Sequence, residues 1–120
     1  MLKSVKELLA WQKAYKLALD TYRLTDGFPK KEQYILVPQI RRAAISVSGN
    51  IAEGYERGHR KEYVQFLMIA RGSLSELETY FLLAKDLGYM HESNYDNIEI
   101  SRKETARLLQ GLLRSLATNP

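Results

Sequence analysis

Cysteine is absent from this chain of 120 residues. That absence excludes a disulfide scaffold, a cysteine nucleophile and a thiolate metal site, and it suits a reducing cytoplasm. With 3 prolines and 7 glycines, the chain also lacks the turn residues of a loop-rich or many-turned all-β fold. No window approaches the roughly 20 apolar residues that span a bilayer. Residues 1–11 interleave Lys3, Lys6 and Glu7 with apolar residues, so we expect neither a signal peptide nor a membrane partner.

What is present is the balance of an ordinary globular protein. Hydrophobic residues make up 45% of the chain and charged residues 27%, which is too apolar for disorder. A chain of this length fits one domain and buries roughly two-thirds of its unfolded surface in a single core. We therefore predict one cytoplasmic domain that spans residues 1–120.

Apolar residues recur at helical spacing in four segments separated by short breaks. The first helix should end at 26–29, since Gly27 permits a left-handed cap and Pro29 cannot continue a helix. Pro38 is expected as the first residue of the second helix, where its missing N–H costs nothing, and that helix should stop near Gly54. The stripe of the first helix comprises Val5, Leu8, Tyr15, Leu19 and Tyr22.

The clearest helical pattern lies in the third segment, where apolar or small residues repeat at four-three spacing without a miss. This helix should end at Gly88, and Ser93 or Asn94 should cap the fourth helix. No run of residues alternates well enough to predict a strand. We therefore predict an all-α fold, an antiparallel up-down-up-down four-helix bundle. The repeat in the third helix comprises Leu67, Ala70, Leu74, Leu77, Phe81, Ala84 and Gly88.

The first and third helices carry more apolar residues than a four-helix core requires. We expect the heptad residues Leu67, Leu74, Leu77 and Phe81 to be buried inside one subunit. Further apolar stripes beside them would remain unpaired, which usually marks an interface, so we predict a homo-oligomer. These further stripes comprise Phe66, Ile69, Ser73, Tyr80, Leu83 and Leu87 on the third helix and Trp11, Ala14 and Ala18 on the first.

Signatures of enzymes are mostly missing from the sequence. The one Glu-x-x-His spacing, at Glu56 and His59, straddles an expected loop, whereas a di-iron bundle needs two such pairs and two further carboxylates. Two histidines without cysteine also disfavour a zinc site, and no glycine-rich phosphate loop is present. Ser46 and Ser73 have no His–Asp arrangement that the sequence indicates. We predict no catalytic residues, no metal and no cofactor, and therefore no enzyme.

Positive charge is concentrated in the first half of the chain. The 18 Lys and Arg residues exceed the 14 acidic residues, which gives a net charge of +4, and the excess lies before residue 73. Two interpretations of Arg41 and Arg42 stay open. The inward arginine could pair with Glu76 or Glu78 of a neighbouring helix, since buried charge is rarely tolerated unpaired. The outward arginine could join a basic surface that contacts phosphate.

If nucleic acid binds, its phosphates should contact the cations of the most positive segment. Arginine holds phosphate oxygens bidentately, and the start of the third helix offers free backbone N–H groups. Acidic residues nearby, among them Glu53, Glu56 and Glu62, could neutralise this cluster. The candidate contacts are Arg42, Arg57, Arg60, Lys61 and Arg71, of which Arg71 could instead pair with Glu78, and the next candidates are Lys3, Lys6 and Lys13.

Several motifs occur in the order found in one bacterial family. They are Phe28-Pro29, QIRRAA at 39–44, NIAEG at 50–54, EYVQFL at 62–67 and ARGSLSELE at 70–78. With the flanking segments 9–14 and 87–89, they cover roughly residues 5–116. Over this length the chain resembles the four-helix bundle family known from proteins encoded in 23S ribosomal RNA intervening sequences. It departs from the family pattern at His59, where a Ser or Thr cap is usual, and at Pro38, where Ser is common.

The resemblance implies an antiparallel four-helix bundle that assembles as a ring-like homopentamer. A more distant branch, the accessory variability determinant of diversity-generating retroelements, is a basic pentameric barrel that binds nucleic acid and its reverse transcriptase. RNA, DNA or a nucleic-acid enzyme are therefore implied as partners, besides further copies of the chain. The resemblance implies no catalytic residues, because none is established in the family.

Three functions stay open on the sequence. The first is a non-catalytic oligomer that binds RNA or other nucleic acid through a modest basic surface repeated by ring symmetry, with an affinity that falls as salt rises. The second is a protein–protein interaction scaffold with no nucleic-acid role. The third, an enzyme with an unrecognised site, has the least support.

Overall fold

The structure is a computed structural model that describes residues 2–117. Within this part of the chain all regular elements are helices, and none of them is long and apolar enough to cross a membrane. The four long helices are α1 (Leu9–Thr25), α2 (Leu36–Arg57), α3 (Arg60–Asp86) and α4 (Glu92–Ala117), and the short 3-10 helices are η1 (Val5–Glu7) and η2 (Lys30–Glu32).

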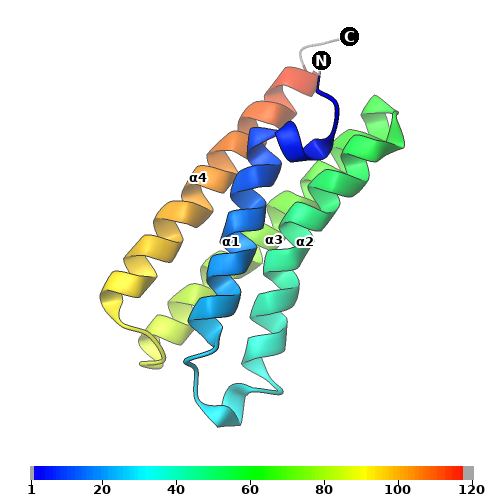
Figure 1. The fold of residues 1–120 in the computed structure, drawn as a ribbon. Helices are drawn as coiled ribbons and strands as arrows, with labels where there is room; N and C mark the ends of the chain where they lie inside the picture. The colour runs from blue at the N-terminus through cyan, green and yellow to red at the C-terminus, as the bar shows by residue number, and fades with distance from the viewer. Residues whose placement is uncertain (1, 118–120) are drawn as a thin grey trace.

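Successive long helices run in opposite directions and form an elongated bundle of 48 × 24 × 21 Å (Figure 1). Each long helix packs against the next one in the sequence, and α4 packs back against α1. This arrangement places α1 and α3 at diagonal corners of the bundle. The start of the described chain and the end of α4 lie at the same end of the molecule (Figure 1). The predicted antiparallel four-helix bundle is confirmed.

The expected heptad residues of α3 form the centre of the core. Leu67, Leu77 and Phe81 are completely buried, and Leu74 is nearly so. They meet apolar side chains from the other three helices, including Leu17, Ile51 and Leu109. The unbroken four-three spacing therefore identified the buried face of α3 correctly.

Helix α1 turns a different face to the core from the one expected. Tyr15, Leu19 and Tyr22 of the predicted stripe are exposed, whereas Ala14 and Ala18, expected at an oligomer interface, are buried. Small alanine side chains let α1 approach its neighbours closely, and the tyrosine hydroxyls stay in water. The buried residues of α1 are Ala10, Ala14, Leu17, Ala18, Thr21 and Thr25.

Gly88 terminates helix α3, as the sequence indicated, two residues after its last helical residue, Asp86. Gly88 has φ of +79°, the left-handed conformation that glycine adopts without a steric penalty. The N–H of Tyr89 donates to the carbonyl of Ala84, and the N–H of Gly88 donates to that of Lys85, both at 2.9 Å. This pair of bonds is a Schellman cap, which satisfies carbonyls at the end of the helix.

The predicted bounds of α2 were wrong at both ends. The helix begins at Leu36, so Pro38 is its third residue rather than its first. Pro38 still lies in the first turn, where a backbone N–H has no acceptor inside the helix. At the other end α2 continues past Gly54 to Arg57, and the left-handed residue that follows is Gly58.

Two smaller boundary predictions also need correction. Helix α1 ends at Thr25 as expected, but Gly27 is not left-handed, since the positive-φ residues in the described chain are Gly58 and Gly88. Helix α4 begins at Glu92, before both Ser93 and Asn94, so neither of these residues is its N-cap.

Gly54 is a packing position between α2 and α3 rather than a helix stop. A Cβ atom at Gly54 would lie 2.9 Å from Cβ of Phe66 and 3.2 Å from the carbonyl oxygen of Tyr63. Further along the same interface, the hydroxyl groups of Ser46 and Ser73 form a hydrogen bond of 2.8 Å. Small side chains therefore let the two helices approach closely along this interface.

A charged cluster of Arg102, Glu99 and Glu78 joins α4 to α3. Nε and Nη2 of Arg102 donate to the two carboxylate oxygens of Glu99 at 2.6 and 2.9 Å, and Nη2 also lies 3.1 Å from Glu78. The side chains of Arg102 and Glu99 are only 8% and 9% exposed. The hydrogen bonds to Glu99 raise the pKa of Arg102 above its ordinary value, although burial opposes this. The arginine is therefore firmly held in its charged form.

We predict that Leu77→Ala lowers the free energy of unfolding by about 2–5 kcal/mol, because it leaves a cavity among fully buried neighbours. Urea unfolding followed by circular dichroism measures the change. Ile100→Ala on α4, where the side chain is 63% exposed, serves as a control and should change stability by less than about 0.5 kcal/mol. A similarly small loss for Leu77→Ala would show that this stripe is not the core.

We predict that Arg102→Ala costs about 3 kcal/mol in the same unfolding measurement, because Glu99 is then buried without a cation. The double variant Glu99→Leu with Arg102→Met removes both charges and should restore most of that loss. If the double variant is less stable than Arg102→Ala, the cluster contributes a net stabilising interaction that apolar packing does not replace.

Candidate nucleic-acid interface

The five candidate phosphate contacts lie in different parts of the bundle. Arg42 belongs to the first half of α2, whereas Arg57 is its last residue, about four turns or 22 Å further along. Arg60 and Lys61 begin α3, and Arg71 lies three turns further along that helix. The structure therefore brings Arg57, Arg60 and Lys61 together and leaves Arg42 and Arg71 apart from them.

Arg57 is neutralised within the subunit. Its Nε lies 3.0 Å from Glu53 and its Nη1 lies 3.6 Å from Glu62, and the guanidinium stacks 5.0 Å above the ring of Phe66. Two of the three acidic residues that the sequence placed close by, Glu53 and Glu62, thus engage this arginine. Its remaining N–H groups can still donate, but its net charge contribution to a surface is small.

Arg60 and Lys61 are the most available cations of this group. Both are exposed, and neither forms an ion pair among the described residues, although Arg60 donates a weak hydrogen bond of 3.4 Å to the carbonyl of Ala117. The N-cap residue His59 has extended backbone and makes no side-chain bond to the helix. The first backbone N–H groups of α3 therefore point toward the same region, where they favour an anion.

Contacts at the C-terminal end of α1 show how Arg41 is held. Arg41 donates to Asp26 at 2.9 Å and to Thr25 at 2.9 Å, and its guanidinium lies 4.5 Å above the ring of Tyr22. The expected pairing with Glu76 or Glu78 is wrong, since the first accepts from Tyr80 and the second pairs with Arg102. Arg42 is exposed and has no ion pair in the described chain.

Arg71 points across the bundle surface toward α4. Its Nη1 lies 3.5 Å from Oε1 of Gln110, so the alternative pairing with Glu78 is wrong. Since this contact joins two exposed side chains at the limit of hydrogen bonding, it restrains the arginine only weakly.

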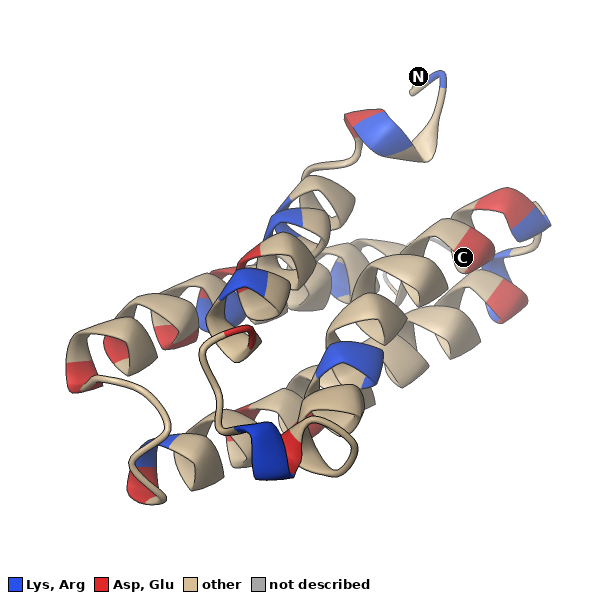
Figure 2. Ribbon diagram, turned by 60° about the horizontal axis from the view of Figure 1, so that its bottom comes forward, with Lys and Arg blue, Asp and Glu red and all other residues tan. Residues whose placement is uncertain are grey.

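Among the next candidates, Lys13 forms an ion pair of 3.0 Å with Glu104 of α4, whereas the ammonium groups of Lys3 and Lys6 have no partner in the described residues. Sequence reasoning passed over Lys30 and Lys31 in η2, which are exposed and also unpaired. The sequence signal for these two cations was a pair of adjacent lysines directly after the Phe-Pro break between α1 and α2. Figure 2 shows blue and red segments following one another along the same helices, so basic and acidic residues are interspersed along the chain.

The described residues do not form a recognisable catalytic or metal-binding group. No three of their His, Asp and Glu side chains are placed to hold a metal ion. Tyr63 and Tyr80 have a raised pKa mainly through burial, and Tyr89 has one mainly through its hydrogen bond to Glu32. These shifts move the phenols away from neutral pH and do not activate them. The absence of an enzymatic activity stays a prediction.

Comparison with known proteins connects this geometry to a family. A family model described as 23S rRNA-intervening sequence protein matches residues 6–111. No curated protein matches the chain. The bundle is similar to the crystal structure of a protein of unknown function from the S23 ribosomal protein family of Bacteroides thetaiotaomicron VPI-5482, with a TM-score of 0.83. The two chains are 22% identical, and the match covers 91% of this chain and 98% of that one.

The likeness to the solved structure confirms the fold, and the family match confirms the resemblance seen in the motifs. The family match extends from residue 6, in η1, to residue 111, in α4, so it includes residues of all four long helices. On this basis the chain belongs to the 23S rRNA-intervening sequence protein family.

Proposed function

We propose that this protein is a non-catalytic subunit of a ring-like homo-oligomer that binds RNA or other nucleic acid through unpaired surface cations. The observation that carries the proposal is the presence of two exposed apolar faces on different sides of the bundle. Exposed apolar side chains in such groups mark protein interfaces.

The first apolar face lies along α1 and α2. Tyr15, Leu19 and Tyr22 of α1 are exposed, and Ile45 of α2 is 48% exposed. Beside them, Tyr22 and Ile45 line a groove of about 540 Å³ together with Pro38. Arg42 borders this groove without an acidic partner.

The second apolar face lies along the outer side of α3. Its large side chains are between 43% and 52% exposed, which is high for leucine, isoleucine and methionine in an isolated subunit. Glu76 and Asp86 are exposed on the same helix and add acidic groups to this side. The apolar residues of this face are Met68, Ile69, Leu82, Leu83 and Leu87.

Because the two faces consist of different residues on different helices, the contact between copies is heterologous. A heterologous contact forms a ring if the rotation between copies closes, and a filament if it does not. The resemblance stated above favours a ring of five. Five chains that each carry a net charge of +4 would form a strongly positive assembly.

Nucleic acid is the partner that such an assembly favours, with Arg60 and Lys61 at the start of α3 as its leading contacts. Their side chains are unpaired with acids, and the helix N-terminus adds N–H donors for phosphate. Ring symmetry would repeat this modest site in every subunit, so several weak contacts would act together. The alternative is a scaffold that binds another protein through the same apolar faces. In that case the surface cations serve solubility.

We predict that sedimentation at micromolar concentration gives a mass several times the 13.9 kDa of one chain. Leu82→Glu with Leu83→Glu should lower that mass to one subunit while the helical circular dichroism is kept, because both residues lie on the second apolar face. Ile100→Glu places the same charge on α4 outside both faces and should leave the oligomer intact. A mass near 14 kDa for the unchanged protein contradicts the proposal.

We predict that the protein binds single-stranded RNA at low salt and releases it as salt rises. Arg60→Ala with Lys61→Ala should reduce the slope of log affinity against log salt by about 1.4, since each phosphate contact contributes about 0.7. Lys103→Ala with Arg107→Ala removes the same charge from exposed, unpaired positions of α4 and is the matched control. If the unchanged protein does not bind RNA at low salt, the proposed RNA binding is contradicted and the scaffold becomes the leading alternative.

A further inference from the structure

A groove of about 540 Å³ lies between the C-terminal part of α1 and the N-terminal part of α4. Further along the boundary between α1 and α4, the ion pair between Lys13 and Glu104 joins the two helices directly. A groove of this volume is within the range of small-molecule sites. Its polar wall on α1 consists of Lys16, Asp20 and Arg23, and its polar wall on α4 consists of Asn94, Asn97 and Ser101.

The α1 wall carries a net positive charge. Nζ of Lys16 lies 2.6 Å from one carboxylate oxygen of Asp20, and Nη1 of Arg23 lies 3.5 Å from the other. Two cations thus share one acid, which orients both of them along the groove. The Lys16 and Arg23 side chains are 64% and 74% exposed, and their remaining N–H groups have no acceptor among the described residues. A planar guanidinium with free N–H groups suits a phosphate.

The α4 wall is neutral and rich in unused hydrogen-bonding groups. The side chains of Asn94, Asn97 and Ser101 make no hydrogen bond in the described structure, although each carboxamide offers two donors and an acceptor. Leu24 and Ile98 provide an apolar surface between the two walls. Carboxamides beside an apolar surface suit the edge and face of a nucleobase, or the hydroxyl groups of a ribose.

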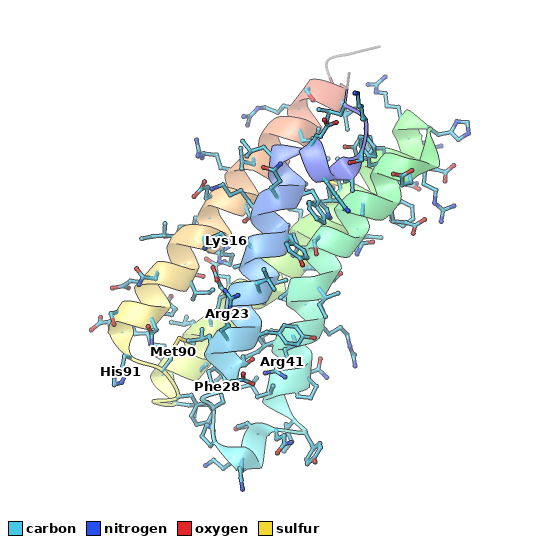
Figure 3. The ribbon with its side chains drawn as sticks, viewed as in Figure 1. Lys16, Arg23, Phe28, Arg41, Met90 and His91 are labelled. Atoms are coloured by element: carbon cyan, nitrogen blue, oxygen red, sulfur yellow. The ribbon has the colours of Figure 1, made fainter. Side chains whose placement is uncertain are left out.

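The groove continues over the turn between α3 and α4. A second hollow of about 280 Å³ shares Leu24, Gly27 and Asn94 with the first and extends to His91. In Figure 3, Lys16 and Arg23 lie along α1, and Met90 and His91 mark the turn that leads into α4. The combined space therefore has room for a group attached to the ligand in the main groove.

We propose that this groove binds a ribonucleotide unit, with its phosphate at Lys16 and Arg23 and its base or ribose at Asn94 and Asn97. A free nucleotide and one nucleotide of an RNA strand share this chemistry. The site goes beyond the proposed function, because it lies at the opposite end of the bundle from Arg60. Inorganic phosphate alone would not engage the hydrogen-bonding side chains of the neutral α4 wall.

The groove stays accessible in the oligomer proposed above. The first apolar face lies on the α2 edge of α1, whereas the groove lies on its α4 edge, and the exposed large hydrophobic residue on α4 in the described chain is Ile100 alone. The interface between copies therefore has little reason to cover α4, and a ligand can enter from solvent.

Calorimetric titration with adenosine 5′-monophosphate, a ten-nucleotide oligoadenylate and inorganic phosphate tests the site. Asn94→Ala with Asn97→Ala should weaken nucleotide or oligonucleotide binding about tenfold, because two neutral hydrogen bonds are lost. Neither asparagine is hydrogen-bonded in the structure, so the variant should fold, which circular dichroism checks. Arg23→Gln should also weaken binding, whereas Arg107→Gln on the outer side of α4 should not. Binding of the monophosphate identifies a free nucleotide as the ligand, and binding of the oligonucleotide alone identifies RNA.

Three results would overturn the site. The asparagine variant could bind both probes as the unchanged protein does, the unchanged protein could bind neither probe, or inorganic phosphate could bind as tightly as the monophosphate. If the asparagine variant keeps RNA binding and Arg60→Ala with Lys61→Ala loses it, the groove assignment is wrong and the proposed function stands. If the monophosphate binds and no RNA does, the groove is confirmed and the proposed function fails.

Discussion

The close approach of α2 and α3 is the constraint on which the rest of the bundle depends. At Gly54 there is no room for a side chain, because a Cβ atom would lie 2.9 Å from Cβ of Phe66. Ser46 and Ser73 meet hydroxyl to hydroxyl further along the interface. Helices that approach this closely leave a groove on each side, into which α1 and α4 pack. A larger residue at Gly54 would separate α2 from α3 and displace the helices that rest on them.

This packing decides which apolar residues the core can accept. The inner space is narrow, so α1 enters it with Ala10, Ala14 and Ala18 around one large residue, Leu17. The tyrosines of α1 and the outer leucines of α3 then stay on the surface. The apolar surface that suggests self-association is therefore a consequence of a tightly packed core, and not of a poorly filled one.

The two edges of α1 differ in chemistry in a way that matches the two proposed contacts. Toward α2, Tyr22 lies beneath the guanidinium of Arg41, and this edge is aromatic and suited to a second copy of the chain. Toward α4, Lys16 and Arg23 surround Asp20, and this edge is charged and open. Some other cations are engaged inside the subunit, as in the Arg102 cluster and around Arg57.

The sequence by itself determined the helical class, the family, the end of α3 at Gly88 and the buried face of α3. These features depend on local periodicity, on the backbone freedom of glycine and on motif order, all of which are visible in the order of the residues. The tertiary structure alone decided which face of α1 is buried, because Tyr15 and Ala14 both repeat at helical spacing and only the width of the inner space selects the smaller residue. It also decided that α2 passes through Gly54, since a glycine that ends a helix and one that admits a neighbouring helix have the same sequence signal. The tertiary structure also decided which acidic residue Arg41 pairs with, which acidic residues Arg57 pairs with, and which residues face one another across the α1–α4 groove. These residues are brought together only when the four helices pack.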